Sequence, residues 1–102
     1  MQNNGLGLLG LCKKAGRMVS GDYACRDALS KGKTYVILLA SDASEHLKRS
    51  YKGLCRDYGI PCLQYVTKAE IGRACGRETA AVISINDEGF SKQFIRLLTE
   101  VD

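Results

Sequence analysis

The chain has 102 residues, of which 45% are hydrophobic and 25% are charged, and its formal net charge is +4. This length fits one domain, residues 1–102, with one hydrophobic core. The longest strongly apolar run, Tyr35 to Ala40, is far shorter than the ~20 residues of a membrane-spanning helix. The N-terminus lacks the basic segment of a secretory signal. We therefore expect a folded, cytoplasmic protein with no membrane partner.

Helical and strand periodicities alternate along the chain. The five predicted helices run over 4–15, over 22–31, from a capping box at 42–45 to Gly59, from a capping box at 67–70 to Gly76, and from Asp87 through Val101. The four predicted strands are 17–20, 35–40, 62–66 and 80–85. This alternation predicts an α/β fold: a three-layer α/β/α sandwich whose small, mixed, mostly parallel sheet of about four strands carries helices on both faces.

Individual residues mark the expected ends of the helices and a close approach between backbones. Ser20 or Asp22 is expected to cap the second helix, and Asp87 the last. Gly7 and Gly10 lie inside the first predicted helix, where glycine costs about 1 kcal/mol relative to alanine. We therefore expect both to lie where another backbone passes close.

The number and spacing of the cysteines argue against a metal site and against a disulfide framework. They contain no Cys-x-x-Cys pair, their number is odd, and the only histidine is His46. Each stands beside leucine or alanine, which favours small buried side chains in a reducing compartment. The five are Cys12, Cys25, Cys55, Cys62 and Cys75.

No group of residues in the sequence indicates catalysis. His46 has no cysteine near it in sequence, and the carboxylates of Asp42 and Glu45 are explained as a helix start. Gly5 to Gly10 matches Gly-x-Gly-x-x-Gly by letter, but it precedes every strand, whereas a dinucleotide site follows one. We expect no catalytic residue, no metal and no cofactor, and thus no enzyme.

The positive charge is concentrated in the first third of the chain. Residues 1–33 hold six basic and two acidic side chains, whereas residues 34–102 hold nine of each. A compact basic patch on an otherwise neutral domain suits a phosphate backbone. A solvated face is the alternative, because lysines at helix C-termini also stabilise the helix dipole. The six basic residues are Lys13, Lys14, Arg17, Arg26, Lys31 and Lys33.

Two blocks of sequence resemble a known family. Residues 11–21 read Leu-Cys-Lys-Lys-Ala-Gly-Arg-Met-Val-Ser-Gly, and residues 70–76 read Glu-Ile-Gly-Arg-Ala-Cys-Gly. With Ile60-Pro61 and the Asp87-x-Gly89-Phe90 segment, they resemble the kink-turn-binding ribosomal proteins of the large-subunit seven-Ae and thirty-e type, in particular small bacterial ribosomal-protein-like members. The resemblance covers nearly the whole chain and implies an α/β/α sandwich that binds structured RNA without catalysis.

The resemblance also implies where RNA is held. In the family, an Asn-Glu-x-x-Lys signature after the glycine turn reads guanines of sheared G·A pairs, and the loop after the short helix makes a second contact. Tyr23, Ala24 and Asp27 stand at the signature positions here, and the loop is 77–80. The implied RNA-binding residues are Lys13, Lys14, Arg17, Gly21, Asp22, Tyr23, Arg26, Lys31, Lys33, Arg73, Arg77, Glu78 and Thr79.

The sequence thus predicts a non-catalytic RNA-binding protein, ribosomal-protein-like, that docks its basic N-terminal face onto a structured ribosomal or other noncoding RNA. Its expected partners are RNA and proteins of the same ribonucleoprotein, with no DNA specificity, and the chain is expected to be a monomer. The departures at Tyr23, Ala24 and Asp27 favour an alternative, a protein–protein adaptor module of the same fold. A third reading is a substrate-recognition piece of the kind attached to ribose methyltransferases, although these 102 residues contain no cofactor-binding half.

Overall fold

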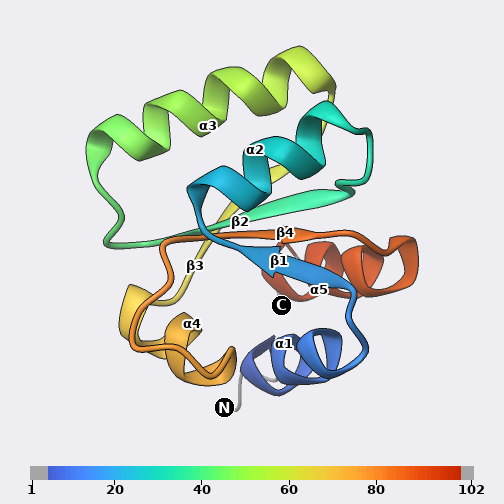
Figure 1. Ribbon diagram of the computed structural model, residues 1–102, viewed down its shortest axis with the longest axis vertical. Coiled ribbons are helices and arrows are strands. Elements are labelled where there is room, and N and C mark those ends of the chain that lie inside the picture. The colour runs from blue at the N-terminus through green and yellow to red at the C-terminus, as the bar shows by residue number, and fades with distance from the viewer. Residues whose placement is uncertain (1–4, 100–102) are drawn as a thin grey trace.

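The computed structural model describes residues 5–99, and helices and strands alternate along them (Figure 1). The helices are α1 (Gly5–Lys14), α2 (Asp22–Ser30), α3 (Glu45–Tyr58), α4 (Lys68–Ala74) and α5 (Glu88–Thr99). The strands are β1 (Met18–Ser20), β2 (Val36–Ala40), β3 (Cys62–Tyr65) and β4 (Val82–Ile85). Each predicted element is present with bounds shifted by a few residues at most, and the predicted ends at Asn4 and Val101 lie outside the described residues.

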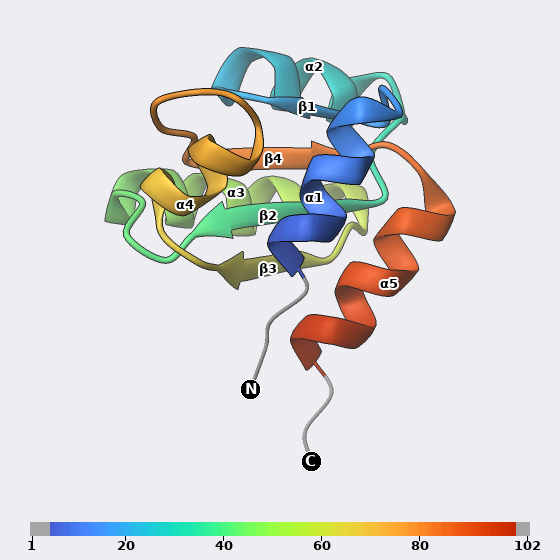
Figure 2. The same cartoon turned by 90° about the horizontal axis from the view of Figure 1, so that it is seen from below.

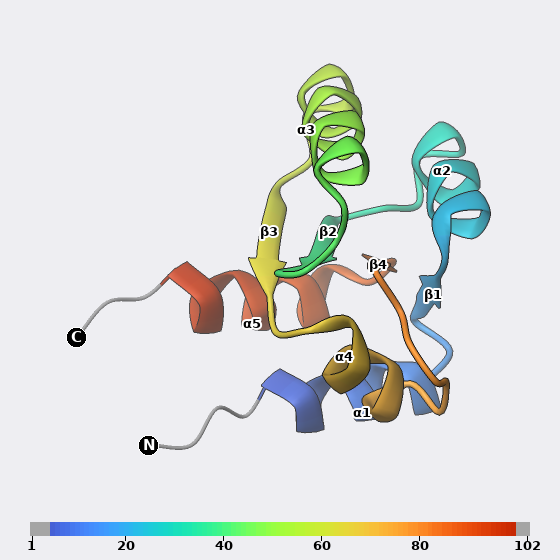
Figure 3. The same ribbon diagram turned by 90° about the vertical axis from the view of Figure 1, so that its left-hand side faces the viewer.

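The elements form three layers, as the sequence predicts. Helices α2 and α3 cover one face of the sheet, and α1, α4 and α5 cover the other (Figure 3). The alternation of side chains along β2 divides the core between these faces. Ile37 and Leu39 pack with Tyr51 of α3 on the first face, whereas Leu38 and Ala40 pack with the α1, α4 and α5 layer on the second.

The sheet is mixed, in the order β1-β4-β2-β3, and the predicted mostly parallel pairing needs correction. Only the β2–β3 pair is parallel, because β4 runs antiparallel to both β1 and β2. The physical reason lies in α4, a helix of seven residues. The Ala80 N–H donates to the Lys68 carbonyl (3.1 Å), so the chain returns to the start of α4, next to the end of β3, and β4 must run back.

The residues at the helix starts agree with prediction in two helices. Thr67 and Glu70 form a capping box before α4, and Asp87 accepts from the Phe90 N–H (2.9 Å) at the start of α5. The box predicted at 42–45 is wrong. Ser44 is the N-cap of α3 and accepts from the Leu47 N–H (3.1 Å).

Two predicted capping carboxylates have other partners. The Asp42 carboxylate accepts from the Lys68 N–H (2.8 Å) and so ties the start of α4 to the end of β2. The N-cap of α2 is Gly21, with no side-chain cap, so neither Ser20 nor Asp22 fills that role. The Asp22 carboxylate instead accepts from the Tyr51 hydroxyl (2.7 Å). Asp42 and Asp22 are therefore positioned by contacts with residues distant in sequence, which local spacing does not reveal.

The glycine that another backbone approaches most closely is Gly72, not Gly7 or Gly10. A Cβ on Gly7 would meet nothing within 4 Å, and one on Gly10 would lie 3.9 Å from the Ala74 carbonyl oxygen. A Cβ on Gly72 would lie only 2.6 Å from the Thr79 Cα. The loop after α4 is therefore packed directly onto the α4 backbone.

The cysteines are free thiols, four of them buried and Cys62 half-buried. Burial raises the pKa of Cys12 to about 11 and that of Cys25 to about 12. Over residues 5–99 no cluster of three or more potential ligands could hold a metal ion. No helix in that same range has the length and hydropathy to cross a bilayer.

Candidate nucleic-acid interface

Strand β1 forms one edge of the sheet and connects the end of α1 to the start of α2. The turn into α2 is built on Gly21, whose φ of 98° lies where only glycine is unstrained. Its N–H donates to the Val82 carbonyl of β4 (3.1 Å), and its carbonyl accepts from the Cys25 N–H (3.0 Å). The Cys25 thiol also donates to the Val19 carbonyl of β1 (3.7 Å), so backbone and side-chain hydrogen bonds together fix the first turn of α2 to the sheet.

A hollow of about 290 Å³ lies between β1, α1, α2 and the loop that follows α4, and we call it the loop hollow. In Figure 2 this loop arches toward the first turn of α2. The Arg77 N–H donates to the Gly72 carbonyl (2.7 Å), which fixes the loop at the residue that lines the hollow. The lining residues are Lys13, Met18, Val19, Ser20, Ala24 and Arg77.

A second hollow, of about 480 Å³, lies where the α1–β1 and α2–β2 turns meet the end of β4, and we call it the turn hollow. Two glycines with positive φ, Gly16 and Gly32, form its turns. Val19 lines both hollows, so the two flank the same edge strand. The lining residues are Gly16, Arg17, Val19, Gly32, Lys33, Tyr35 and Asn86.

The first turn of α2 carries a hydrogen-bonded cluster against α3. The buried Tyr51 hydroxyl donates to the Asp22 carboxylate (2.7 Å), and Arg26 Nε donates to the same oxygen (2.8 Å). The Arg26 guanidinium also donates to Ser50 (2.8 Å) and lies 5.2 Å from the Tyr51 ring centroid. The Tyr51 hydrogen bond, with Arg26 beside it, lowers the pKa of Asp22. Asp22 and Arg26 therefore hold α2 on α3.

The remaining cations differ in how they are paired. Lys31 forms an ion pair with Asp27 (3.2 Å), and Arg17 lies 3.9 Å from Asp87. Among the predicted site residues, five exposed cations have no ion pair within residues 5–99: Lys13, Lys14, Lys33, Arg73 and Arg77. Of these, Lys13 and Arg77 line the loop hollow and Lys33 lines the turn hollow.

The predicted site residues thus divide between two places. Lys13 and Arg77 come together in the loop hollow beside Gly21, whereas Arg17 and Lys33 come together in the turn hollow. Tyr23 is 85% exposed at the start of α2. The other predicted residues of the α4 segment are exposed but line neither hollow: Arg73, Glu78 and Thr79.

Sequence reasoning missed two residues of the turn hollow. Tyr35 directly precedes an apolar strand and was assigned to it, yet it is 45% exposed. Asn86 follows β4 in a segment that the pattern identifies only as a helix start. The available signal was the position of each residue at the end of a buried strand, where the chain reaches the surface.

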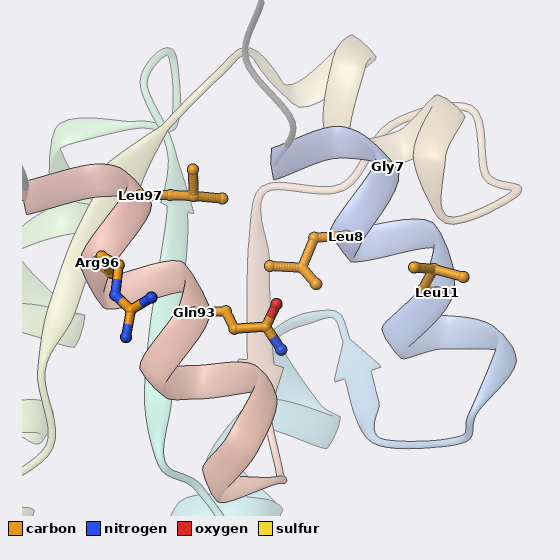
Figure 4. A pocket seen from close by; sticks show the side chains of 6 residues that line it. All are labelled: Gly7, Leu8, Leu11, Gln93, Arg96 and Leu97. Atoms are coloured by element: carbon orange, nitrogen blue, oxygen red, sulfur yellow. The ribbon is translucent and has the colours of Figure 1, made fainter.

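A third hollow, of about 490 Å³, is a groove between α1 and α5, and we call it the helix groove. Figure 4 shows Leu8 and Leu97 projecting into the space between the two helices. Leu11 is 60% exposed and Leu97 is 40% exposed. Three leucines, Leu8, Leu11 and Leu97, therefore give this groove an apolar lining, beside Gln93 and Arg96.

A mixed four-stranded sheet lies between two helical layers, and the unpaired cations beside its edge strand suit the binding of an anionic partner. The model of the ribosomal protein L7Ae/L30e/S12e/Gadd45 family matches residues 3–95, and the chain belongs to this family. The RNA-binding members of the family are not enzymes, and membership places this chain in a non-catalytic class.

Several proteins are similar to the chain over most of its length. The RNA-binding protein YlxQ of Bacillus subtilis is 31% identical over 89% of this chain and 91% of its own, and the YlxQ of Enterococcus faecium is 30% identical over 91% and 89%. A solved protein of unknown function from Bacillus halodurans is 31% identical, covers 97% of this chain and 100% of its own, and has a TM-score of 0.93. The 15.5 kDa RNA-binding protein of Giardia lamblia shares the fold, with a TM-score of 0.77, 21% identity and coverage of 91% and 80%.

Proposed function

We propose that the chain is a non-catalytic RNA-binding protein, one domain over residues 1–102, that holds a structured RNA against the loop hollow. The observation that carries this proposal is the pair of unpaired cations, Lys13 and Arg77, that line one hollow together with Ser20 and Ala24, which flank the Gly21 turn. The names of the YlxQ relatives give RNA as the partner class. Structured RNA is recognised through its backbone and through bases at irregular points, which suits cations around a fixed turn.

The roles of the residues follow from their positions. Lys13 and Lys14, in the last turn of α1, contact phosphates together with Arg17, Lys31 and Lys33. The Gly21 turn, with Tyr23 beside it, and the loop 77–80 face bases or a kinked backbone. If about five phosphates are neutralised, log affinity falls with log salt at a slope of about −3.5 to −4.5.

The test is charge reversal in the loop hollow. Lys13→Glu with Arg77→Glu should abolish retention of bacterial ribosomal RNA in a filter-binding assay at moderate salt. The matched control is Lys52→Glu with Arg56→Glu, which changes the net charge equally on exposed positions of α3. Equal losses in both double variants, or none in the first, would show that net charge and not this hollow binds RNA.

The altered signature bears on which RNA is bound. Asp27 pairs with Lys31, and Ala24 lines the loop hollow with a methyl group, so neither provides the base contacts of the family signature. Each missing bidentate contact is worth about 1–3 kcal/mol. We expect weak binding to a standard kink-turn duplex and tighter binding by the triple variant Tyr23→Asn, Ala24→Glu, Asp27→Lys. An unchanged affinity of the triple variant for the kink-turn would contradict this account.

The helix groove supports a second function, as a protein–protein adaptor. Its apolar side chains Leu8, Leu11 and Leu97 lie on α1 and α5, in the layer opposite α2. A pull-down from lysate before and after RNase separates the two functions. Protein partners that remain after nuclease treatment and are lost on Leu11→Lys would favour the adaptor, whereas partners lost with the RNA favour RNA binding.

A further inference from the structure

The turn hollow contains two side chains to which the proposed docking of RNA gives no role, Tyr35 and Asn86. A half-exposed aromatic ring, Tyr35, stands beside two cations, Arg17 and Lys33, and an amide, Asn86. We propose that the turn hollow binds one unpaired nucleotide, with its base stacked on Tyr35 and its phosphate between Arg17 and Lys33. The inference rests on the proposed function only in taking RNA as the partner class.

The two cations of the turn hollow are available to a phosphate. Within the described part of the chain Lys33 has no ion pair. The Arg17 Nε lies 3.9 Å from Asp87, at the limit of ion pairing, and the Asp87 carboxylate already accepts from the Phe90 N–H (2.9 Å). Because Arg17 is 59% exposed, its guanidinium is free to turn toward a ligand.

The backbone N–H groups of Lys33, Tyr35 and Asn86 in the turn hollow are all occupied by hydrogen bonds within the protein. The Tyr35 N–H donates to the Ile85 carbonyl (2.8 Å), and the Lys33 N–H donates to the Ala28 carbonyl (3.0 Å). The Asn86 N–H donates to the Arg17 carbonyl (2.8 Å). Recognition of a ligand in this hollow therefore depends on side chains.

A chain of hydroxyl groups orients the Asn86 amide. Ser84 Oγ donates to Asn86 Oδ1 (2.6 Å), so the proton of the buried Thr34–Ser84 hydrogen bond (2.9 Å) comes from Thr34. With Oδ1 occupied in this way, Asn86 presents its Nδ2–H groups as donors. Such donors pair with the carbonyl and ring-nitrogen acceptors that every base carries on its edge, whereas an inorganic anion would leave the Tyr35 ring unused.

The test is NMR titration of the ¹⁵N-labelled chain with the unstructured hexamer r(ACACAC), compared with inorganic phosphate at matched ionic strength. The hexamer should shift the amides of Gly32 to Tyr35 and the Asn86 side chain and move the Tyr35 ring protons upfield. Phosphate alone should leave the ring protons unchanged. Loss of stacking in Tyr35→Leu should weaken hexamer binding about 10-fold, while Tyr35→Phe and the matched control Tyr58→Leu bind like the parent chain.

Three results would decide against the inference. If phosphate reproduces the ring shifts, the hollow is an anion site only, and if Tyr35→Leu binds the hexamer like the parent, no base stacks there. If the hexamer shifts residues outside the turn hollow only, the nucleotide site is elsewhere. These failures are separable from failure of the proposed function, because Lys13→Glu with Arg77→Glu removes structured RNA and should leave the hexamer shifts in place.

Discussion

The loop hollow and the turn hollow share one edge strand but are built in different ways. The loop hollow depends on tertiary packing: the loop carrying Arg77 sits directly on Gly72, and α2 is held by Asp22 and Tyr51. The turn hollow is built around two local turns, at Gly16 and Gly32, whose amides are satisfied within neighbouring segments. Substitution of Gly72 or Tyr51 should therefore disturb the first hollow and spare the second, whereas substitution of Gly16 or Gly32 should do the reverse.

The difference also separates charges that hold the fold from charges that are free to bind. Arg26 carries the same charge as Arg77, yet its guanidinium is occupied by Asp22 and Ser50. Arg77 has no ion pair within residues 5–99. A count of positive residues treats the two as equal, and only the contacts distinguish them.

The largest effect is expected from a substitution that disrupts the loop hollow and leaves the turn hollow intact. In Gly72→Ala the new methyl group would lie 2.6 Å from the Thr79 Cα, so the backbone must move. We expect a loss of about 2–3 kcal/mol in the free energy of unfolding, measured by urea denaturation. RNA retention should fall because Arg77 moves with the loop, and r(ACACAC) should still shift the turn hollow.

The control for this variant is the same substitution at an open helical position. Gly7→Ala meets nothing within 4 Å and should stabilise the chain by about 0.5–1 kcal/mol through helix propensity. If Gly72→Ala unfolds at the same urea concentration as Gly7→Ala, the close packing of the loop is not as described.

The next effect concerns the attachment of α2. Tyr51→Phe removes the hydroxyl that donates to Asp22 and leaves the ring in place. Because the Asp22 carboxylate is half-exposed, we expect a loss of only about 1 kcal/mol in unfolding free energy. Tyr58→Phe, on an exposed residue, should have no effect in the same urea assay. Equal stability of both variants would remove Tyr51 from the support of the loop hollow.

A smaller effect is expected in the pH dependence of stability. Hydrogen bonds from Tyr51 and Arg26 hold the pKa of Asp22 below its usual value, so the ionised carboxylate stabilises the fold above pH ~4, and this contribution is lost as the pH falls through the lowered pKa. Asp22→Asn should cost less than about 1 kcal/mol at pH 7. Thermal unfolding at several pH values should show the difference from the parent shrinking below pH ~4, and a constant difference would contradict it.

The smallest effect on RNA retention is expected at β3, the edge of the sheet opposite β1, where a label can be attached as a control. Cys62 on β3 is half-buried, and a hydrogen bond from Cys55, with Lys52 nearby, lowers the pKa of its thiol. Iodoacetamide at pH 8 should modify Cys62 on the order of 100-fold faster than Cys12, whose pKa is about 11. Mass spectrometry checks the site, and Cys62→Ser should remove the fast reaction. Labelling there should leave RNA retention unchanged.

The fold was largely predictable because its signals are local. Helical spacing, the Thr67 capping box and the apolar strand 36–40 each specify an element without reference to the rest of the chain. The direction of β4 was harder to predict from the sequence. The connection through α4 could cross the sheet and make β4 parallel to β3, or stay at the end of β3 and make it antiparallel. The contact of Ala80 with Lys68 decides this, and it is a tertiary hydrogen bond.

The candidate site was predictable in its residue types and not in its geometry. The concentration of lysine and arginine before residue 34 indicated the face, and the family resemblance indicated the Gly21 turn and the loop 77–80. Nothing local in the sequence shows that Arg26 also contacts Ser50 of α3, or that Arg17 and Lys33 share a hollow with Tyr35. Both arrangements depend on how elements distant in sequence pack together.

Of the four strands in residues 5–99, β4 is synthesised last, yet it lies between β1 and β2. Strand β1, synthesised first, has no other neighbour in the sheet, and the Gly21 turn hydrogen-bonds to Val82 of β4. The basic N-terminal segment therefore cannot take its final form until residues 82–85 have emerged. A nascent chain stalled before β4 would present the same cations on an unformed surface, so the proposed RNA site would form only after β4 has been synthesised.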